Sequence, residues 1–260
     1  MPLVMTDAVV LHAFDYLESS RIIRLATRDA GLQSVLARGA RSSSRRFGLG
    51  LDLFASGVAQ IQLRPGRELQ QLDGFDLTSS RDPIARDLER FAAASALAEL
   101  ALRFADGDEP GDLYATLIAA LDAVAAAPGD RARDVGLAAA WHLVAGFGFA
   151  PVLTRCCRCE LLLADEDTAT FSHGAGGCAC RACAPLLPRG RPLPPEARAA
   201  LRAWTTGTVG TDWPVIETAM RRAHLRLLRE FLEQHLNDGR PLRAFETWER
   251  GLGTLGAALG

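Results

Sequence analysis

The sequence predicts an α+β protein in which an N-terminal β-barrel is followed by an all-α domain with an inserted four-cysteine module. Three observations support this fold class. Short apolar runs separated by turn residues fill the first 80 residues, helical periodicity begins near Asp82, and all six cysteines lie between residues 156 and 183. A chain of 260 residues has room for one large domain or for two to three small ones.

Five apolar runs in the first 80 residues have the length and spacing of β-strands. Turn-forming residues separate them, including Asp29-Ala30-Gly31 and Pro65-Gly66. Spacing of this kind is typical of a small barrel or sandwich, and a five-stranded OB-fold β-barrel fits the length. The expected strands lie at residues 7–14, 21–27, 32–37, 51–63 and 68–77.

The rest of the chain has the apolar periodicity of α-helices outside the cysteine-containing stretch. Asp82 and Pro83 predict a helix start, with a side-chain cap and a proline at the first helical position. Asn237 and Gly239 predict the end of the last long helix. The expected helices lie at residues 82–104, 111–127, 134–147, 194–205 and 214–237.

Four cysteines form two C-x2-C pairs with 20 residues between them, and this spacing is typical of a zinc site. Each C-x2-C turn directs two thiolates at one point, so two turns complete a tetrahedral shell of four sulfur atoms. The expected ligands are Cys156, Cys159, Cys180 and Cys183. Cys157 and Cys178 are expected to be unligated thiols, although either could replace a neighbouring ligand.

Three alternatives to a structural zinc site are less favoured. A disulfide framework is typical of small secreted domains, and the N-terminus does not resemble a signal peptide. A thioredoxin-like site needs a single C-x-x-C motif in a βαβ unit. A catalytic zinc site keeps an open position and often uses a histidine, for which His173 is the nearby candidate.

These patterns divide the chain into five expected segments. They are an OB-fold nucleic-acid-binding domain at 1–80, the first part of a helical domain at 81–150, a zinc-binding module at 151–190, the C-terminal part of the helical domain at 191–250, and a disordered tail at 251–260.

All 29 basic residues are arginines, so any anion site must use guanidinium groups, which suit phosphate. The segment between Asp29 and Asp52 contains no acidic residue and combines arginines with serines and glycines. On a small barrel such a loop predicts contact with a nucleic-acid backbone, and the alternative is a solvated turn. The candidate DNA-binding residues are Arg38, Arg41, Arg45 and Arg46.

Aromatic residues on the predicted barrel offer a second kind of contact with nucleic acid. Phe14, Tyr16 and Phe47 are candidates to stack on bases. Phe54 and Phe75 are expected to fill the core instead.

A second group of arginines lies on the last long helix. Arg222 and Arg226 are four residues apart and therefore share one face. This face is a candidate second anion surface or a docking site for an acidic partner peptide, and the alternative is the polar side of an amphipathic helix. The full group is Arg221, Arg222, Arg226 and Arg229.

Several function classes are excluded or disfavoured. With 48% hydrophobic residues the chain is not expected to be a disordered protein. No apolar stretch is long enough for a membrane span, so the expected location is the cytoplasm. There is no lysine for a Walker motif and no H-E-x-x-H or G-x-S-x-G motif. The G-x-G-x-x-G match at Gly251 has only four residues after it. An enzyme is therefore not expected.

The chain resembles the RecO family of bacterial DNA repair proteins over residues 6–245. The resemblance depends on the order and spacing of many short motifs and not on any single one. Examples are Thr27-Arg-Asp-Ala-Gly31, Val35-Leu-Ala-Arg38-Gly-Ala-Arg41, Phe147-Gly-Phe-Ala-Pro151, Phe171-Ser-His-Gly-Ala-Gly-Gly177, Cys180-Arg-Ala-Cys183 and Arg240-Pro-Leu-Arg243. The chain departs from the family pattern in Cys157 and Cys178, and in having arginine wherever lysine is frequent.

This resemblance implies a recombination mediator that binds single- and double-stranded DNA, anneals complementary strands and helps to load the RecA recombinase onto strands coated by single-strand-binding protein (SSB). It implies RecR and the acidic C-terminal tail of SSB as partners, and the Arg221–Arg229 face is then a candidate dock for that tail. The alternative is a zinc-stapled protein–protein adaptor without direct DNA binding, which the net charge of −5 over residues 81–150 favours. A metalloenzyme is a more distant alternative.

Overall fold

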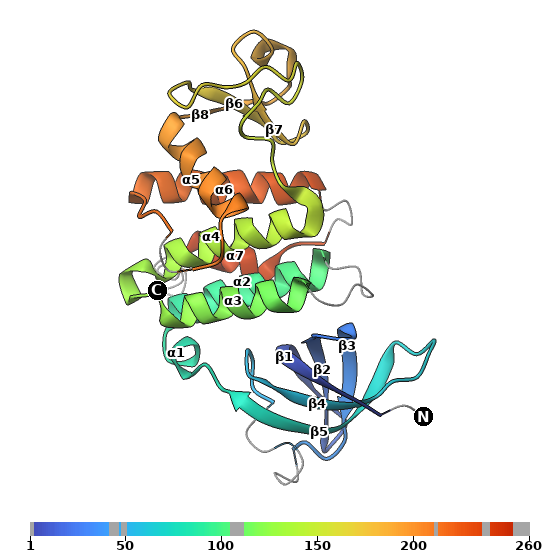
Figure 1. Cartoon of the computed structure of the whole chain (residues 1–260). Coiled ribbons are helices and arrows are strands. Elements are labelled where there is room, and N and C mark those ends of the chain that lie inside the picture. Colours follow the sequence, from blue (N-terminus) through green and yellow to red (C-terminus); the bar gives the residue numbers. More distant parts are fainter. Residues whose placement is uncertain are drawn as a thin grey trace.

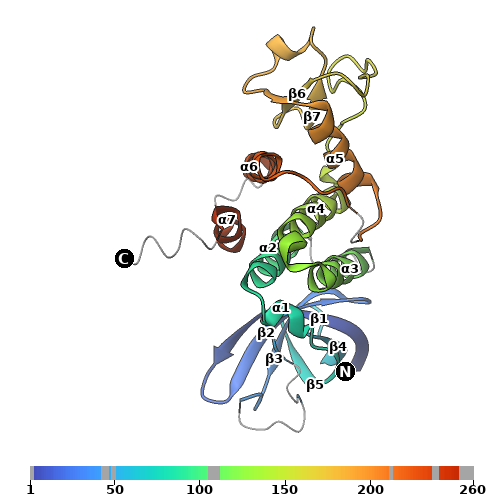
Figure 2. The same cartoon turned by 90° about the vertical axis from the view of Figure 1, so that its left-hand side faces the viewer.

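The computed structural model describes residues 3–41, 47, 51–104, 112–210, 213–235 and 240–251. Three parts follow one another along the molecule: a closed β-barrel, a layered group of helices and a small three-stranded sheet (Figure 1). The view turned by 90° shows the same order, with the barrel and the small sheet at opposite ends (Figure 2). The α+β fold class predicted from the sequence is confirmed.

The barrel has the five strands of an OB-fold. Its strands pair in the closed order β1-β2-β3-β5-β4, antiparallel except between β3 and β5, which run parallel. The predicted strand at 51–63 begins only at residue 56, because the residues before it form a turn in which Phe54 has a φ of 67°. The strands are β1 (Leu3–Tyr16), β2 (Ser20–Thr27), β3 (Gly31–Ala37), β4 (Ser56–Gln62) and β5 (Leu69–Ser79).

Both faces of β1 are buried in its central part. Successive residues of a strand point to opposite faces, so Ala8 and Val10 pack inside the barrel while Val9 and Leu11 pack against the helices. Phe54 also faces the helices, and its ring lies 5.6 Å from that of Phe91 in an edge-to-face arrangement. The barrel and the helical part therefore share a continuous apolar contact.

The helical part contains the five predicted helices and two differences from the prediction. The helix expected at 82–104 is broken at Arg86 and Asp87, and its first residue is preceded by Arg81 in a left-handed conformation without a side-chain cap. The last helix was not predicted, because only Phe245 and Trp248 of its eight residues are buried. The helices are α1 (Asp82–Ala85), α2 (Leu88–Phe104), α3 (Asp112–Ala126), α4 (Ala132–Val144), α5 (Pro195–Thr206), α6 (Thr218–His235) and α7 (Arg243–Arg250), with short helical turns η1 (Gly129–Arg131), η2 (Ala145–Phe149) and η3 (Ala184–Leu186).

Small residues let α2, α4 and α7 approach closely. A Cβ atom on Gly136 of α4 would lie 2.8 Å from the Cβ of Ala93 on α2 and 3.1 Å from the ring of Trp248 on α7. Any larger residue at position 136 would push these helices apart.

No helix in the described part of the chain is long and apolar enough to cross a lipid bilayer.

Arg81 joins the barrel to the helices. Its side chain is 4% exposed, and its Nε donates to Asp122 Oδ1 of α3 at 2.8 Å. Its Nη1 donates to the Phe54 carbonyl oxygen at 2.7 Å and to Ser56 Oγ at 2.6 Å. One buried guanidinium group thus connects β4, the turn before it and α3.

The small sheet consists of β6 (Ala169–Ser172), β7 (Gly177–Ala179) and β8 (Arg191–Leu193), in the order β7-β6-β8. An ion pair ties it to α6, in which Arg191 Nε donates to Glu230 Oε2 at 2.6 Å. His173, at the end of β6, faces the same carboxylate at 3.5 Å from its Nε2. These contacts hold the cysteine-containing part against the helices.

Candidate nucleic-acid interface and metal centre

Four cysteines converge at the far end of the molecule from the barrel. Their sulfur atoms all lie within 4.8 Å of one another, and Cys159 Sγ is 3.8 Å from Cys180 Sγ. Both C-x2-C segments are tight turns, since the Glu160 N–H donates to the Cys156 carbonyl oxygen at 3.0 Å and the Cys183 N–H to the Cys180 carbonyl oxygen at 3.1 Å. This is the set predicted from the sequence, and the group could hold a metal ion.

The pKa values of two of these thiols are shifted in opposite directions. Burial alone would raise the pKa of Cys156, but the backbone N–H groups of Cys180, Cys159 and Arg158 outweigh it and lower that pKa to about 6. Hydrogen bonding with Cys159, followed by burial, raises the pKa of Cys183 to about 12. Four thiols this close cannot all ionise alone, and a divalent cation would offset the repulsion between four thiolates.

The other two cysteines and His173 lie outside this group. Cys178 is completely buried in the core of the helical part, and desolvation raises its pKa to about 12. Cys157 is half-buried, and burial raises its pKa as well. His173 is directed at Glu230. None of the three belongs to the convergent set of sulfur atoms.

The predicted arginine loop of the barrel follows β3. Arg38 and Arg41 are exposed, whereas Arg45 and Arg46 lie outside the described residues. Arg41 Nη1 is 3.6 Å from Asp15 Oδ2 and shares this carboxylate with Arg21. Arg38 forms no ion pair within the described part of the chain. The two described arginines of the loop therefore lie in different electrostatic environments.

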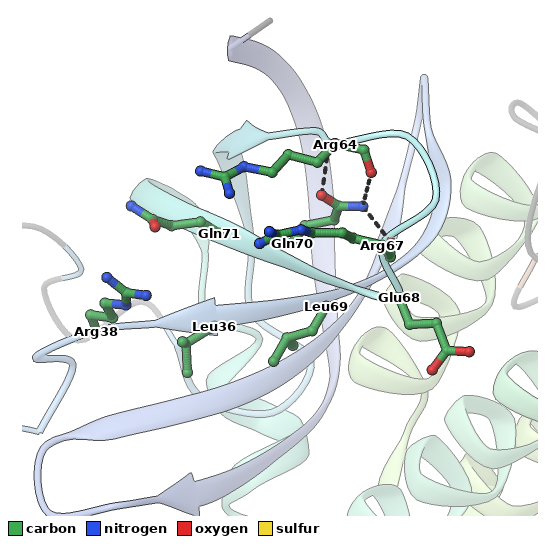
Figure 3. Close-up of a pocket in the computed structure, with 8 residues that line it drawn as sticks. All are labelled: Leu36, Arg38, Arg64, Arg67, Glu68, Leu69, Gln70 and Gln71. Carbon is green, nitrogen blue, oxygen red and sulfur yellow. Dashed lines mark hydrogen bonds between the residues drawn. The ribbon is translucent and has the colours of Figure 1, made fainter. Parts of the chain in front are cut away.

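A pocket of about 470 Å³ opens beside Arg38, where β3 runs parallel to β5 (Figure 3). The turn between β4 and β5 brings Arg64 and Arg67 to the same pocket. These two arginines are absent from the predicted site residues. The signal that marks them in the sequence is Arg64-Pro-Gly-Arg67, a turn motif with an arginine at each end.

The candidate stacking residues divide into two groups. Phe14 and Tyr16, near the end of β1, are 45% and 41% exposed. Phe47 is 3% exposed and belongs to the barrel core, so its prediction as a stacking residue is wrong. Phe54 and Phe75 are buried, as expected. Phe47 fills the small barrel, although two arginines, Arg45 and Arg46, precede it in the sequence.

The four arginines predicted on α6 do not form one cationic face. Arg221 forms a bidentate pair with Asp134 of α4, whose side chain is 3% exposed. Arg229 pairs with Glu249 at 3.1 Å and Glu233 at 3.2 Å.

The other two arginines of α6 point outward. Arg222 and Arg226 are exposed and have no ion-pair partner within the described ranges. Arg226 borders a cavity of about 210 Å³ that α6 forms with β8 and the start of α5. Leu193, Ala197 and Leu227 give this cavity apolar walls. Only half of the predicted group is therefore available to an external anion.

Comparisons with known proteins match the whole chain. The family model described as "Recombination protein O N terminal" matches residues 1–81, and "Recombination protein O C terminal" matches residues 85–244. A protein named DNA repair protein RecO from Anaeromyxobacter sp. (strain K) is 37% identical over 267 residues, which is 100% of both chains. A protein with the same name from Anaeromyxobacter dehalogenans (strain 2CP-1 / ATCC BAA-258) is 37% identical, over 97% of this chain and 96% of that one. Another from Syntrophotalea carbinolica (strain DSM 2380 / NBRC 103641 / GraBd1) is 34% identical, over 68% of each chain.

Proposed function

Because the chain belongs to the RecO family of DNA repair proteins, we propose that it acts as a recombination mediator. In this role it binds single- and double-stranded DNA, anneals complementary strands and, with RecR, helps to load RecA onto single strands coated by SSB. It breaks and forms no covalent bond, so it needs no catalytic residue. It acts in the cytoplasm and joins the nucleoid during repair.

The observation that carries this proposal is the arginine loop on an OB-fold barrel. Arg38 is exposed and has no ion-pair partner among the residues described, so its guanidinium group is available to a phosphate. OB-folds bind single strands with a cationic groove and exposed aromatic rings, and Phe14 and Tyr16 supply such rings at one end of β1. Contacts of this kind hold the backbone without reading its bases.

Annealing requires two phosphate chains to approach despite their repulsion. A protein with two separate cationic surfaces can neutralise both chains and release their counterions. The barrel offers Arg38 and its neighbours, and α6 offers Arg222 and Arg226. Helices α2 and α4 lie between the barrel and α6 in both views, so the two surfaces are separated in space (Figures 1 and 2).

Zinc is the metal that the four cysteines favour. A closed shell of four thiolates suits a structural zinc ion and leaves no open position for a reacting water molecule. Cys156, Cys159, Cys180 and Cys183 would hold the ion, which would fix the two turns that carry them. We assign the metal a role in folding of the module that contains β6 and β7.

The outward face of α6 is the proposed dock for the SSB tail. Arg222 and Arg226 would pair with acidic residues of the tail, and the apolar cavity beside Arg226 would take an apolar side chain. Arg221 and Arg229 are occupied by intramolecular pairs and contribute to the fold instead.

The direct test is fluorescence anisotropy of a labelled single-stranded oligonucleotide, titrated with the protein at low and at moderate salt. Binding that weakens steeply with salt supports the mediator and leads to strand-annealing assays. Absence of binding at low salt contradicts it. In that case the adaptor hypothesis, which the acidic helical segment favours, is tested with the protein partners.

A further inference from the structure

The two arginines of the β4–β5 connection occupy fixed positions in a type II turn. Proline stands at the second position and glycine at the third, where Gly66 has a φ of +76° that a side chain would strain. The Arg67 N–H donates to the Arg64 carbonyl oxygen at 3.2 Å and closes the turn. Arg64 and Arg67 therefore flank the turn, and their side chains extend in the same direction over the pocket (Figure 3).

The side chain of Gln70 fixes this turn through hydrogen bonds to its backbone. The Arg64 N–H donates to its Oε1 at 2.8 Å, and its Nε2 donates to the carbonyl oxygens of Arg64 and Arg67 at 3.1 and 2.7 Å. Gln70 is 8% exposed, and its carboxamide satisfies three backbone groups at once. A side chain at this position that cannot accept and donate would leave the Arg64 N–H and the Arg67 carbonyl oxygen without these partners, while the Arg64 carbonyl oxygen would keep only the Arg67 N–H. The turn is thus fixed by one side chain that lines the same pocket.

The pocket combines positive charge with apolar walls. Arg38, Arg64 and Arg67 surround it, and none of them has an ion-pair partner within the described parts of the chain. Glu68 also lines it, but its carboxylate points away from the guanidinium groups (Figure 3). Leu36 on β3 and Leu69 on β5 provide the apolar surface between the charges. Its volume of about 470 Å³ lies in the range of pockets that take a small organic ligand.

We propose that this pocket takes one unstacked nucleotide of a single-stranded nucleic acid. Arg64, Arg67 and Arg38 hold its phosphodiester group, the leucines contact its sugar or base, and Gln70 is a positioning residue that keeps the two turn arginines aligned. A duplex keeps its bases stacked and paired, so it cannot turn a base out against the leucines. This inference rests on the proposed function and adds the subsite and the preferred strand form.

The arginines are tested by anisotropy with labelled oligo-deoxythymidine over a series of salt concentrations. The double variant Arg64→Ala/Arg67→Ala loses two of the three guanidinium groups that neutralise this phosphate, so the slope of log K against log salt falls by about 0.7. Affinity at low salt falls roughly tenfold. The control Arg86→Ala/Arg250→Ala removes the same charge from exposed sites just after α1 and at the end of α7, where the side chains are 79% and 69% exposed, and leaves the slope unchanged.

Gln70→Met tests positioning separately from charge. Methionine keeps the length of the side chain but makes none of the three hydrogen bonds. The arginines remain but must be ordered on binding, so affinity falls roughly fivefold while the salt slope stays the same. Gln60→Met, on the outer surface of β4, is the matched control and binds like the wild type. Thermal unfolding of each variant identifies any loss of fold, and the arginine variants test the pocket independently of Gln70.

The outcomes separate the two levels of the proposal. If the wild type binds the oligonucleotide but the arginine variants bind equally well with the same slope, this subsite is wrong while the proposed function stands. If the wild type does not bind, both are wrong. If the Arg64→Ala/Arg67→Ala substitution weakens binding of a hairpin duplex as much as binding of the single strand, the preferred strand form is contradicted. Inorganic triphosphate that displaces the oligonucleotide at equal phosphate concentration shows a site for small polyanions instead.

Discussion

The arginines of the barrel and those of α6 form similar groups in the sequence but have different surroundings in the structure. On the barrel, Arg38, Arg64 and Arg67 meet at one pocket with no ion-pair partner among the described residues. On α6, Arg221 and Arg229 pair with carboxylates of α4, α6 and α7. A guanidinium group can stabilise the fold or bind an external phosphate, and its nearest carboxylate decides which.

The two ends of the molecule also differ in what stabilises them. The barrel has its own apolar core, which includes Ile23, Leu25 and Phe75. The cysteine-containing part has only a small apolar cluster of its own around its thiols, with Leu163 and Leu187 beside it, because Phe171 and Cys178 belong to the core of the helical part. A part with so little apolar surface needs another source of stability, and a metal ion is the usual one. The barrel should therefore be insensitive to chelation, and the module should not be.

The largest expected effect is that of Cys180→Ser. Loss of one thiolate opens the shell, so the zinc content falls and the free energy of unfolding decreases by about 4 kcal/mol, or on the order of 10 °C in Tm. Binding of a single strand by the barrel is retained at temperatures where the variant is folded. Zinc analysis and calorimetry measure the effect, and a variant with a full complement of zinc and an unchanged Tm would contradict a closed four-thiolate site.

Arg221→Ala comes next, because it leaves a buried carboxylate without its partner. Asp134 is 3% exposed, and removing one member of such a pair costs about 3 kcal/mol. Arg222→Ala on the same helix is the matched control, and its exposed side chain should change stability by less than about 0.5 kcal/mol. Urea denaturation of both variants measures the difference. Equal stabilities would show that the inner and outer arginines of α6 do not differ as described.

His224, on the inner side of α6, makes stability depend on pH. Burial lowers its pKa to about 4 from the usual 6.5, so the unfolded chain takes up the proton first as the pH falls. Stability is complete above about pH 6.5 and decreases by about 3 kcal/mol as the pH falls to 4. Burial also lowers the pKa of His173 and His235, which adds to the decrease in the same direction.

The variant His224→Leu isolates this contribution. Its free energy of unfolding, measured in urea between pH 4 and 7, should decrease less than that of the wild type over this range. Parallel curves for the two proteins would show that another group produces the pH dependence.

Substitutions in the loop after β3 should have the smallest effect on stability but a clear effect on binding. Arg38→Ala/Arg41→Ala/Arg46→Ala should lower affinity for a single strand by roughly tenfold, flatten its salt dependence and leave the Tm unchanged. Among these three, Arg41 should contribute less than Arg38, because Asp15 lies 3.6 Å from its guanidinium group. Anisotropy with the single variants tests this order, and equal effects would mean that the ion pair with Asp15 opens on binding.

Much of the fold could be predicted from the sequence because it depends on local patterns. Alternating apolar residues indicated the five strands, and the two C-x2-C pairs indicated which four of six cysteines converge. The misses arise where a long-range contact overrides a local pattern. The short helix α7 forms because Phe245 and Trp248 are buried, and Phe47 turns inward to fill the barrel. Arg64 and Arg67 were missed because they meet Arg38 only through the parallel pairing of β3 with β5.

By itself, the sequence determined the order of the parts, the helical and strand periodicities, the cysteine group and the concentration of arginine in the loop after β3. Each of these depends on residues close together in the chain or on a simple repeat of residue types. The tertiary structure decided which arginines are paired, which aromatic rings are exposed and where a pocket opens. Those properties depend on side chains brought together from distant segments, such as Asp134 with Arg221 and Arg38 with Arg67, and the energy of a charge is set by its neighbours in space.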